Sequence, residues 1–167
     1  MSIQVFKVHH RGSHDLENSY RKNFWGIKIP GLVVQFSVSE TSHVFIMGSV
    51  GFEHRKIPLR GTNNTRYAIG IAGRLEHVDE LGNRRWIKGS KWGTNIASGA
   101  HHYGIIPLSG YLEVNPGNHE ISFWADCHTD AKGAYSHPVQ IKGTSDSGLP
   151  GGTSDPYNQM IVRIEKK

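Results

Sequence analysis

The stretch "VNPGNHEISFWADCHTD", residues 114–130, decides the fold. Pro116-Gly117 is typical of a tight turn, because proline presets φ and glycine tolerates positive φ. After the turn, residues of one parity are apolar and most residues of the other parity are polar, which is the period of a half-buried strand. The first set is Ile121, Phe123, Ala125 and Cys127, and the second is Glu120, Ser122, Trp124 and Asp126. We expect a hairpin corner followed by a strand that packs its first set inward.

The same alternation recurs along the chain, whereas helical periodicity is scarcely present. Strands are predicted over 3–8, 27–39, 43–54, 66–79, 84–88, 101–114, 119–128, 137–141 and 159–166. Pro30-Gly31 indicates a bulge or an edge entry, and Pro107 a break or an edge position. Gly82-Asn83 is interpreted as a turn, and residues 89–100 as a loop. The pattern predicts an all-β protein, an antiparallel β-sandwich of jelly-roll topology with eight to nine strands.

Length and composition fit one domain. The chain has 167 residues, 37% of them hydrophobic, 20% charged and 20 of them glycine, which favours a folded protein with many turns. We expect residues 1–167 to form a single jelly-roll domain. Within it, residues 1–26 form a polar N-terminal segment, and the Gly/Ser/Asp/Pro-rich residues 143–158 form a long exposed loop.

Charge and cysteine content limit the classes of partner and the cellular locations that we expect for this protein. The net charge is +5, and the densest basic group, which lies beside Trp86 and Trp92, is Arg84, Arg85, Lys88 and Lys91. With no basic helix or arm, nucleic acid is not a favoured partner. Cys127 is the single cysteine and is interpreted as a small buried hydrophobe. Neither a Sec-type signal peptide nor a membrane-spanning window is present. An extracellular or virion-surface location is expected, and a cytoplasmic one stays open.

The order of segments resembles a known family. "IPGLVVQFSVSETSHVFIMGSVGFE", "YAIGIAGRLE", "IPLSGYLEVNPGNHEISFWAD" and the terminal "MIVRIEK" are similar to the tumour necrosis factor-like jelly roll, shared with complement globular heads, in its microbial or phage versions. The resemblance covers about residues 27–165 and rests on patterns rather than fingerprints. The segments around 79–100 and 129–158 are longer than the plain pattern.

The resemblance implies a compact homotrimer that recognises a glycan or a cell-surface receptor and carries no catalytic machinery. One pattern in the residues agrees with this. Ile161 lies between Met160 and Val162, so the last strand is apolar on both faces and needs cover on both. A second sheet covers one face, and a neighbouring subunit or a loop is expected to cover the other.

Eleven histidines raise the alternative of a metal enzyme. A cupin-type site takes two histidines two residues apart, a glutamate and a later histidine after a Pro-Gly turn. His119 follows such a turn, but the first half is missing, because His101 and His102 are adjacent and point to opposite faces. His119 is therefore interpreted as the first residue after a turn. His128 and Asp130 share one side of a strand end and are candidates for a sugar or metal contact.

Aromatic residues suggest a ligand surface, since indole and phenol rings stack on sugars while polar groups bind the hydroxyls. The predicted ligand-binding residues are Arg85, Trp86, Trp92, Asn95, His101, Tyr103, Trp124, His128 and Asp130. No cofactor is expected, although Asp146 and Asp155 offer oxygen ligands for a weak calcium site.

The sequence thus predicts a non-enzymatic recognition module, expected to be a homotrimer, that binds a glycan or a cell-surface receptor. Two alternatives stay open: a structural or assembly subunit of a phage or particle, and a cupin-like metal-dependent enzyme.

Overall fold

The computed structural model describes residues 3–12, 14–16, 26–54, 68–97, 102–129, 139–141 and 158–167. Eleven strands and no helix occur in these ranges. The strands are β1 (Ile3–His9), β2 (His14–Leu16), β3 (Ile27–Val38), β4 (Ser42–His54), β5 (Ala68–Val78), β6 (Arg84–Trp86), β7 (Trp92–Ala97), β8 (His102–Val114), β9 (Gly117–Thr129), β10 (Val139–Ile141) and β11 (Gln159–Lys166). The all-β prediction is confirmed.

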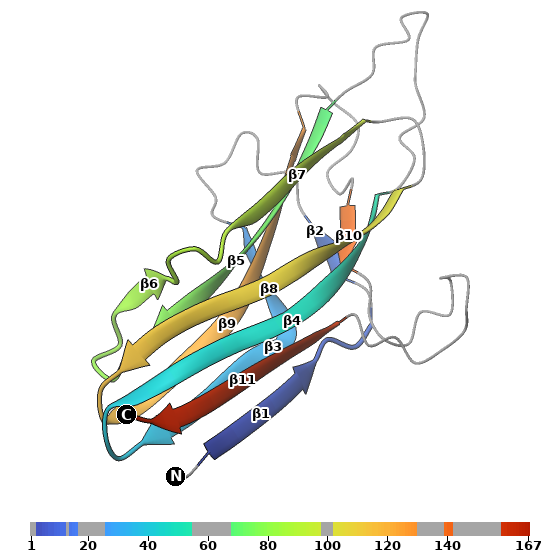
Figure 1. Ribbon diagram of the computed structural model, residues 1–167. Helices are drawn as coiled ribbons and strands as arrows, with labels where there is room; N and C mark the ends of the chain where they lie inside the picture. The colour runs from blue at the N-terminus through green and yellow to red at the C-terminus, as the bar shows by residue number, and fades with distance from the viewer. Residues whose placement is uncertain are drawn as a thin grey trace, which may run out of the picture.

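Two antiparallel sheets face each other (Figure 1). The front sheet has the order β1-β11-β4-β8, with the short β10 and β2 extending it, and the back sheet has the order β3-β9-β5 with β6 and β7 on the far side of β5. The three-residue strands β2, β6 and β10 can be left out and the remaining eight strands numbered 1 to 8 along the chain. The strand orders of the two sheets are then 1-8-3-6 and 2-7-4-5. Two interleaved Greek keys of this kind make a jelly roll, so the predicted topology is confirmed.

Several predicted boundaries differ from the structure. The expected loop 89–100 contains β7, which pairs with β5 from Gly73↔Trp92 to Ala68↔Ala97. Pro107 does not break its strand: β8 runs through it because β8 is an edge strand and the proline is exposed. The polar segment 1–26 contributes β1 and β2, both paired in the front sheet. Of the predicted loop 143–158, all but Asn158 lies outside the described residues.

β4 is the strand on which the front sheet is built. It pairs with β8 along its whole length and, on its other side, with β11 over Ser42–Ser49 and β10 over Phe52–His54. Asn158 bridges the gap between β10 and β11: its Oδ1 accepts a hydrogen bond from the Gly51 amide at 2.7 Å. Its carbonyl accepts another from the His10 amide at 3.0 Å. Asn158 is 2% exposed, so these polar groups have little access to water. Its hydrogen bonds replace backbone bonds that a continuous strand would make at this point.

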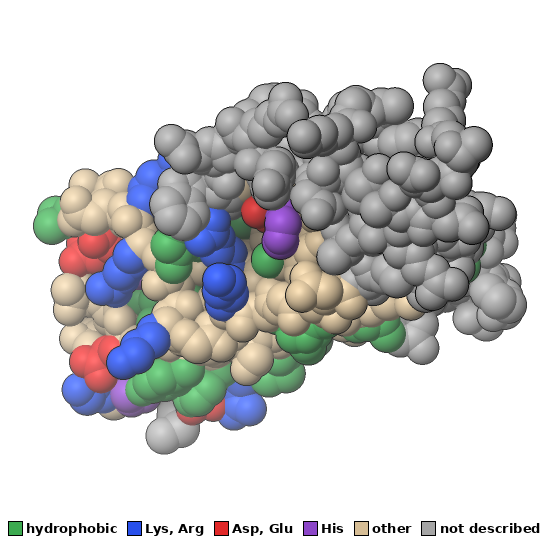
Figure 2. All heavy atoms as spheres, turned by 90° about the horizontal axis from the view of Figure 1, so that it is seen from above, with side chains coloured by type: hydrophobic (Ala, Val, Ile, Leu, Met, Phe, Trp, Pro, Cys, Tyr) green, Lys and Arg blue, Asp and Glu red, His purple; other side chains and the backbone are tan. Residues whose placement is uncertain are grey.

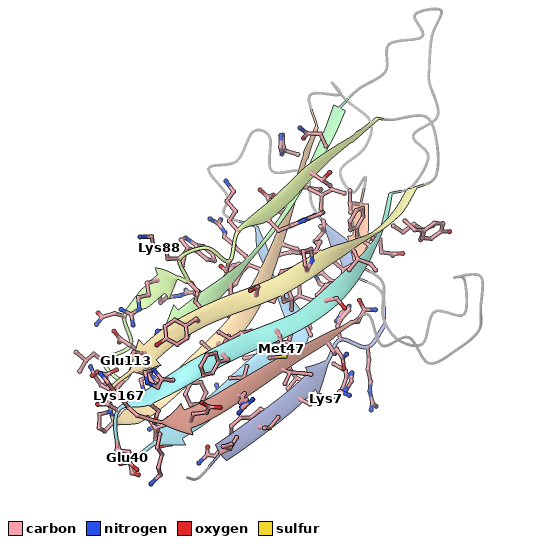
Figure 3. All side chains as sticks on the ribbon, viewed as in Figure 1. Lys7, Glu40, Met47, Lys88, Glu113 and Lys167 are labelled. Carbon is pink, nitrogen blue, oxygen red and sulfur yellow. The ribbon has the colours of Figure 1, made fainter. Side chains whose placement is uncertain are left out.

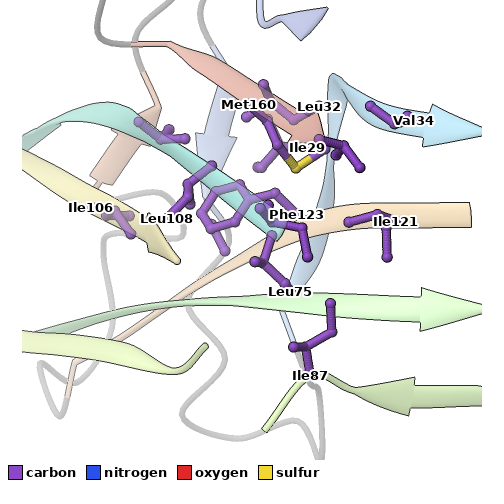
Figure 4. Close-up of a cluster of buried hydrophobic side chains, with 14 of the residues drawn as sticks. Ile29, Leu32, Val34, Leu75, Ile87, Ile106, Leu108, Ile121, Phe123 and Met160 are labelled. Atoms are coloured by element: carbon purple, nitrogen blue, oxygen red, sulfur yellow. The ribbon is translucent and has the colours of Figure 1, made fainter. Parts of the chain in front are cut away.

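The inner faces of the sheets make one core (Figure 4). All four predicted inward residues of β9 are buried, and Phe123 lies at the centre, among Leu75, Ile106 and Met160. Gly73 leaves room for that ring, because a Cβ there would lie 2.8 Å from Phe123 and from Ile106. Ser122 was expected on the polar outer face and lies there, but it is fully buried by its neighbours.

Replacing Asn158 with alanine tests the bridge. The buried Gly51 amide would lose its acceptor, so we expect Asn158→Ala to lower the free energy of unfolding by about 1–3 kcal/mol. Urea denaturation followed by tryptophan fluorescence measures this. Asn118→Ala, at an exposed position, is the matched control and should change stability by less than about 0.5 kcal/mol. Equal effects of the two substitutions would contradict the bridging role.

Candidate functional site

The outer face of the front sheet is apolar. Eight side chains from four strands form what we call the apolar face: Ile3, Val5, Phe45, Met47, Tyr103, Ile105, Tyr111 and Ile161. Val5 is 61%, Tyr111 54% and Met47 48% exposed. Met47 and Lys7 lie on this face in Figure 3, and hydrophobic side chains line the lower border of Figure 2. Ile161 lies on it, as its position in the sequence requires.

Charged pairs lie both within this face and at one end of it: Arg163 and Glu165 lie on β11, between Val5 and Ile3 of β1 and Phe45 of β4. Lys166 pairs with Glu40, Arg163 pairs with Glu165, and the Lys167 Nζ lies 3.0 Å from Glu113 Oε2. Tyr111 hydrogen-bonds His43 Nδ1 at 2.9 Å and stacks on that ring. Exposed apolar and aromatic side chains mixed with a few charged pairs are typical of the composition of protein–protein interfaces.

The outer face of the back sheet has the opposite character. Glu76, on β5, accepts hydrogen bonds from the Arg84 guanidinium at 2.9 and 3.0 Å and from the Trp124 indole at 3.1 Å. The Ser122 hydroxyl lies 3.4 Å from the same carboxylate. Glu76 is 5% exposed. The carboxylate of Glu76 on β5 therefore holds side chains from two neighbouring strands, β6 and β9, so polar groups on this face bind one another.

Two of the predicted ligand residues meet on that face. Trp86 and Trp124 pack edge-to-face with ring centroids 5.9 Å apart, and the Arg74 guanidinium lies 3.6 Å from the Trp86 centroid. Arg74 thus covers one face of the exposed Trp86. The loop between β6 and β7 adds exposed Lys88 and Lys91, and Figure 2 shows basic side chains gathered on this side.

The other predicted ligand residues lie apart from this pair. Arg85 points to the inner side of β6, while Trp92 packs against the core and lies 6.2 Å from Phe52 between ring centroids. Tyr103 lies on the apolar face, on the opposite sheet. Asn95 is exposed on β7, and the His128 ring lies over Gly70. His101 and Asp130 lie outside the described residues, as do the proposed calcium ligands Asp146 and Asp155.

A buried histidine pair was not foreseen from the sequence. His77 is 0% and His119 4% exposed, so His119 is part of the core rather than a solvated turn residue. Four groups form a chain of hydrogen bonds: Arg85 Nε to His77 Nδ1 at 3.3 Å, His77 Nε2 to His119 Nδ1 at 3.1 Å, and His119 Nε2 to the Asn115 carbonyl at 2.9 Å.

The direction of this chain is fixed. Arginine only donates and a carbonyl only accepts, so in this chain of hydrogen bonds His77 Nε2 donates to His119 Nδ1, and His119 Nε2 donates to the Asn115 carbonyl. Burial, then the Arg85 charge, then His119 lower the pKa of His77 to about 4. Asn115 also donates to Glu80 at 3.0 Å, and this hydrogen bond lowers the pKa of Glu80. The histidine pair and the Asn115–Glu80 hydrogen bond therefore join the β5–β6 turn to the β8–β9 turn.

The described residues offer few candidates for a metal-binding or nucleophilic site. No group of three histidine, cysteine or acidic side chains there is arranged to hold a metal. Burial raises the pKa of Cys127 to about 12, which keeps the sulfur a thiol and argues against a nucleophile. No helix able to cross a membrane occurs among the described residues.

Comparisons with known proteins find a likeness in fold and none in sequence. No protein-family model and no curated protein matches the sequence. Two structures of infectious bursal disease virus are similar: a chain of the Gt strain at a TM-score of 0.52 and 10% identity, covering 98% of this chain. A chain of the Gx strain matches at a TM-score of 0.54 and 10% sequence identity, and the match covers 99% of this chain. This chain spans 38% and 37% of their lengths, so the likeness shows a shared β-sandwich fold.

The histidine pair predicts a dependence of stability on pH. The unfolded His77 binds its proton near pH 6.5 and the folded one near pH 4, so the unfolded state holds more protons between these values. Stability is complete above pH 6.5 and should fall by about 3 kcal/mol as pH drops to 4. His77→Gln keeps one donor and one acceptor without a titrating ring, so its loss of stability should be smaller. Equal pH slopes of the two proteins in denaturation curves would refute this role.

Proposed function

We propose that this chain is a structural or assembly subunit of a particle, and that it associates with further copies of itself through the apolar face. The observation that carries the proposal is the exposure of six apolar side chains on the outer face of the front sheet, with Phe45 and Ile161 half-buried on the same face. Single exposed apolar residues are common, but a contiguous patch marks an interaction site. Water contact with this face costs free energy that a second copy would recover.

The composition of the face favours a protein partner. Tyr111, Phe45 and Met47 lie at its centre, and aromatic and methionine side chains are enriched in the buried centres of interfaces. The neighbouring ion pairs would then form part of the rim. The back sheet offers no comparable apolar surface in the described residues, because polar side chains such as the Arg84–Glu76 and Lys28–Glu120 pairs occupy its outer face.

The shared fold supports the same proposal. The two similar chains belong to structures of a virus, and a jelly roll in a particle uses its surfaces to contact other subunits. We propose a homotrimer on a virion or similar particle as the assembly unit, since three copies can close a ring around one such face. An enzymatic role is not proposed, and no cofactor is required for this function.

Changing the centre of the apolar face tests the proposal. Met47→Glu would bury an unpaired charge in the contact, so we expect self-association to weaken by about tenfold or more. Sedimentation velocity over a concentration series measures it. Leu81→Glu is the control, because Leu81 is 79% exposed at the β5–β6 turn and lies off the face. Unchanged association of Met47→Glu, or equal loss in both variants, would exclude this surface.

Glycan or receptor recognition is the second candidate function. The observation that favours it is the Trp86–Trp124 pair beside Arg74, which offers an exposed indole edge in a basic setting that also holds Arg84, paired with Glu76. An acidic sugar suits these groups better than a neutral one, because Arg74 already covers a face of Trp86.

A glycan array with the native chain and with Trp86→Ala tests this function. Binding of acidic glycans that drops about tenfold or more in Trp86→Ala would support it, since removing an aromatic contact of this kind costs about 1–3 kcal/mol. Tyr103→Ala, on the other sheet, should leave binding unchanged. No binding of any glycan would count against the recognition function without affecting the assembly proposal.

A further inference from the structure

Free sheet edges are normally protected, because unpaired amide and carbonyl groups invite pairing with another chain. Three of the edges described here carry such protection. β3 is interrupted at Pro30-Gly31, where its register with β9 shifts, and β8 contains Pro107. β6 is only three residues long. Proline, register shifts and short length each prevent a further strand from adding.

β1 has no proline, no register shift and no short length, and its one charged side chain is the exposed Lys7. Its sequence "IQVFKVH" contains neither proline nor glycine, and its seven residues pair with β11 in unbroken register. No described strand pairs with its other side, and it forms the outer border of the front sheet in Figure 1. β7, the other edge strand of comparable length, contains Gly93. Among the described edges, β1 is the one suited to accept a partner strand.

We propose that β1 pairs with β1 of a second copy in an antiparallel, two-fold arrangement, so that the front sheets of two chains become continuous. The proposal rests on the proposed function in taking self-association as given, and it adds a second contact to the apolar face. A second copy fits this edge, because the exposed Val5 and Ile3 would be covered by the equivalent strand of the other chain across a two-fold axis. Pairing joins the two apolar faces into one surface.

The structure also limits the register. At the end of β1 the backbone of β3 comes close, since a Cβ on Gly31 would lie 2.6 Å from the His9 carbonyl oxygen. The free part of the edge is therefore Ile3 to Lys7. Centring the two-fold axis on Val5 uses all of it: Val5 faces Val5 of the second copy, and Ile3 faces Lys7. This register also separates the two Lys7 side chains, which would repel if directly opposed.

Cysteine cross-linking tests both the pairing and the register. Cys127, the only native cysteine, is buried at 0% exposure, so an added cysteine would be the reactive one. Val5→Cys should form a disulfide-linked dimer under copper-phenanthroline oxidation, because directly opposed Cβ atoms lie about 4.5–5.5 Å apart. Ile3→Cys has the same strand and face but would lie far from its counterpart. Leu81→Cys reports random collisions.

We expect Val5→Cys to cross-link about tenfold faster than Ile3→Cys and Leu81→Cys, because only Val5 lies on the axis. Equal rates in all three variants would overturn the pairing. Val5→Lys, which opposes two cations, provides a second readout and should weaken dimerisation in sedimentation experiments. If Val5→Cys fails to cross-link while Met47→Glu still dissociates a native oligomer, the strand pairing is wrong and the assembly function stands. If the native chain is monomeric, both fail together.

Discussion

Burial of the inner faces between the two sheets is the interaction on which the rest of the structure depends. Phe123 is fully buried at its centre, and Gly73 provides the space for its ring. Strand side chains alternate, so fixing Phe123 inward also fixes Trp124 outward, and burying Ile46 fixes Met47 outward. The composition of both outer faces therefore follows from the core, and a shift of one residue in register would exchange them.

The two outer faces have become chemically different. On the back sheet, Glu76 collects hydrogen bonds from Arg84 and Trp124 and leaves few unsatisfied groups on that surface. On the front sheet, Tyr111, Met47 and Val5 face outward and are each about half exposed or more. A chain with one internally satisfied face and one apolar face is well suited to pack against copies of itself through the second.

The sequence predicts local features better than contacts between distant residues. β9 and β11 follow from strict alternation, and the outward position of Ile161 follows from its neighbours. β7 was missed because glycine, lysine and asparagine around Trp92 are typical of loops, whereas pairing with β5 determines its structure. His77 and His119 are 42 residues apart and meet only because β5 and β9 are adjacent. His77 lies just before a charged turn and His119 just after a Pro-Gly turn, and neither position gives a local signal of burial. Trp86 and Trp124 were named among the ligand residues, but their contact likewise depends on strand order.

The native mass of the unmodified chain, measured by light scattering after size exclusion, tests the central claim most directly. A monomer has a mass of 18.6 kDa. The account predicts a stable multiple of that mass, three copies for the proposed trimer alone and six where the two-fold β1 contact also forms, because exposed apolar residues on one sheet require cover. A monomer that persists at high concentration would contradict self-association through the apolar face.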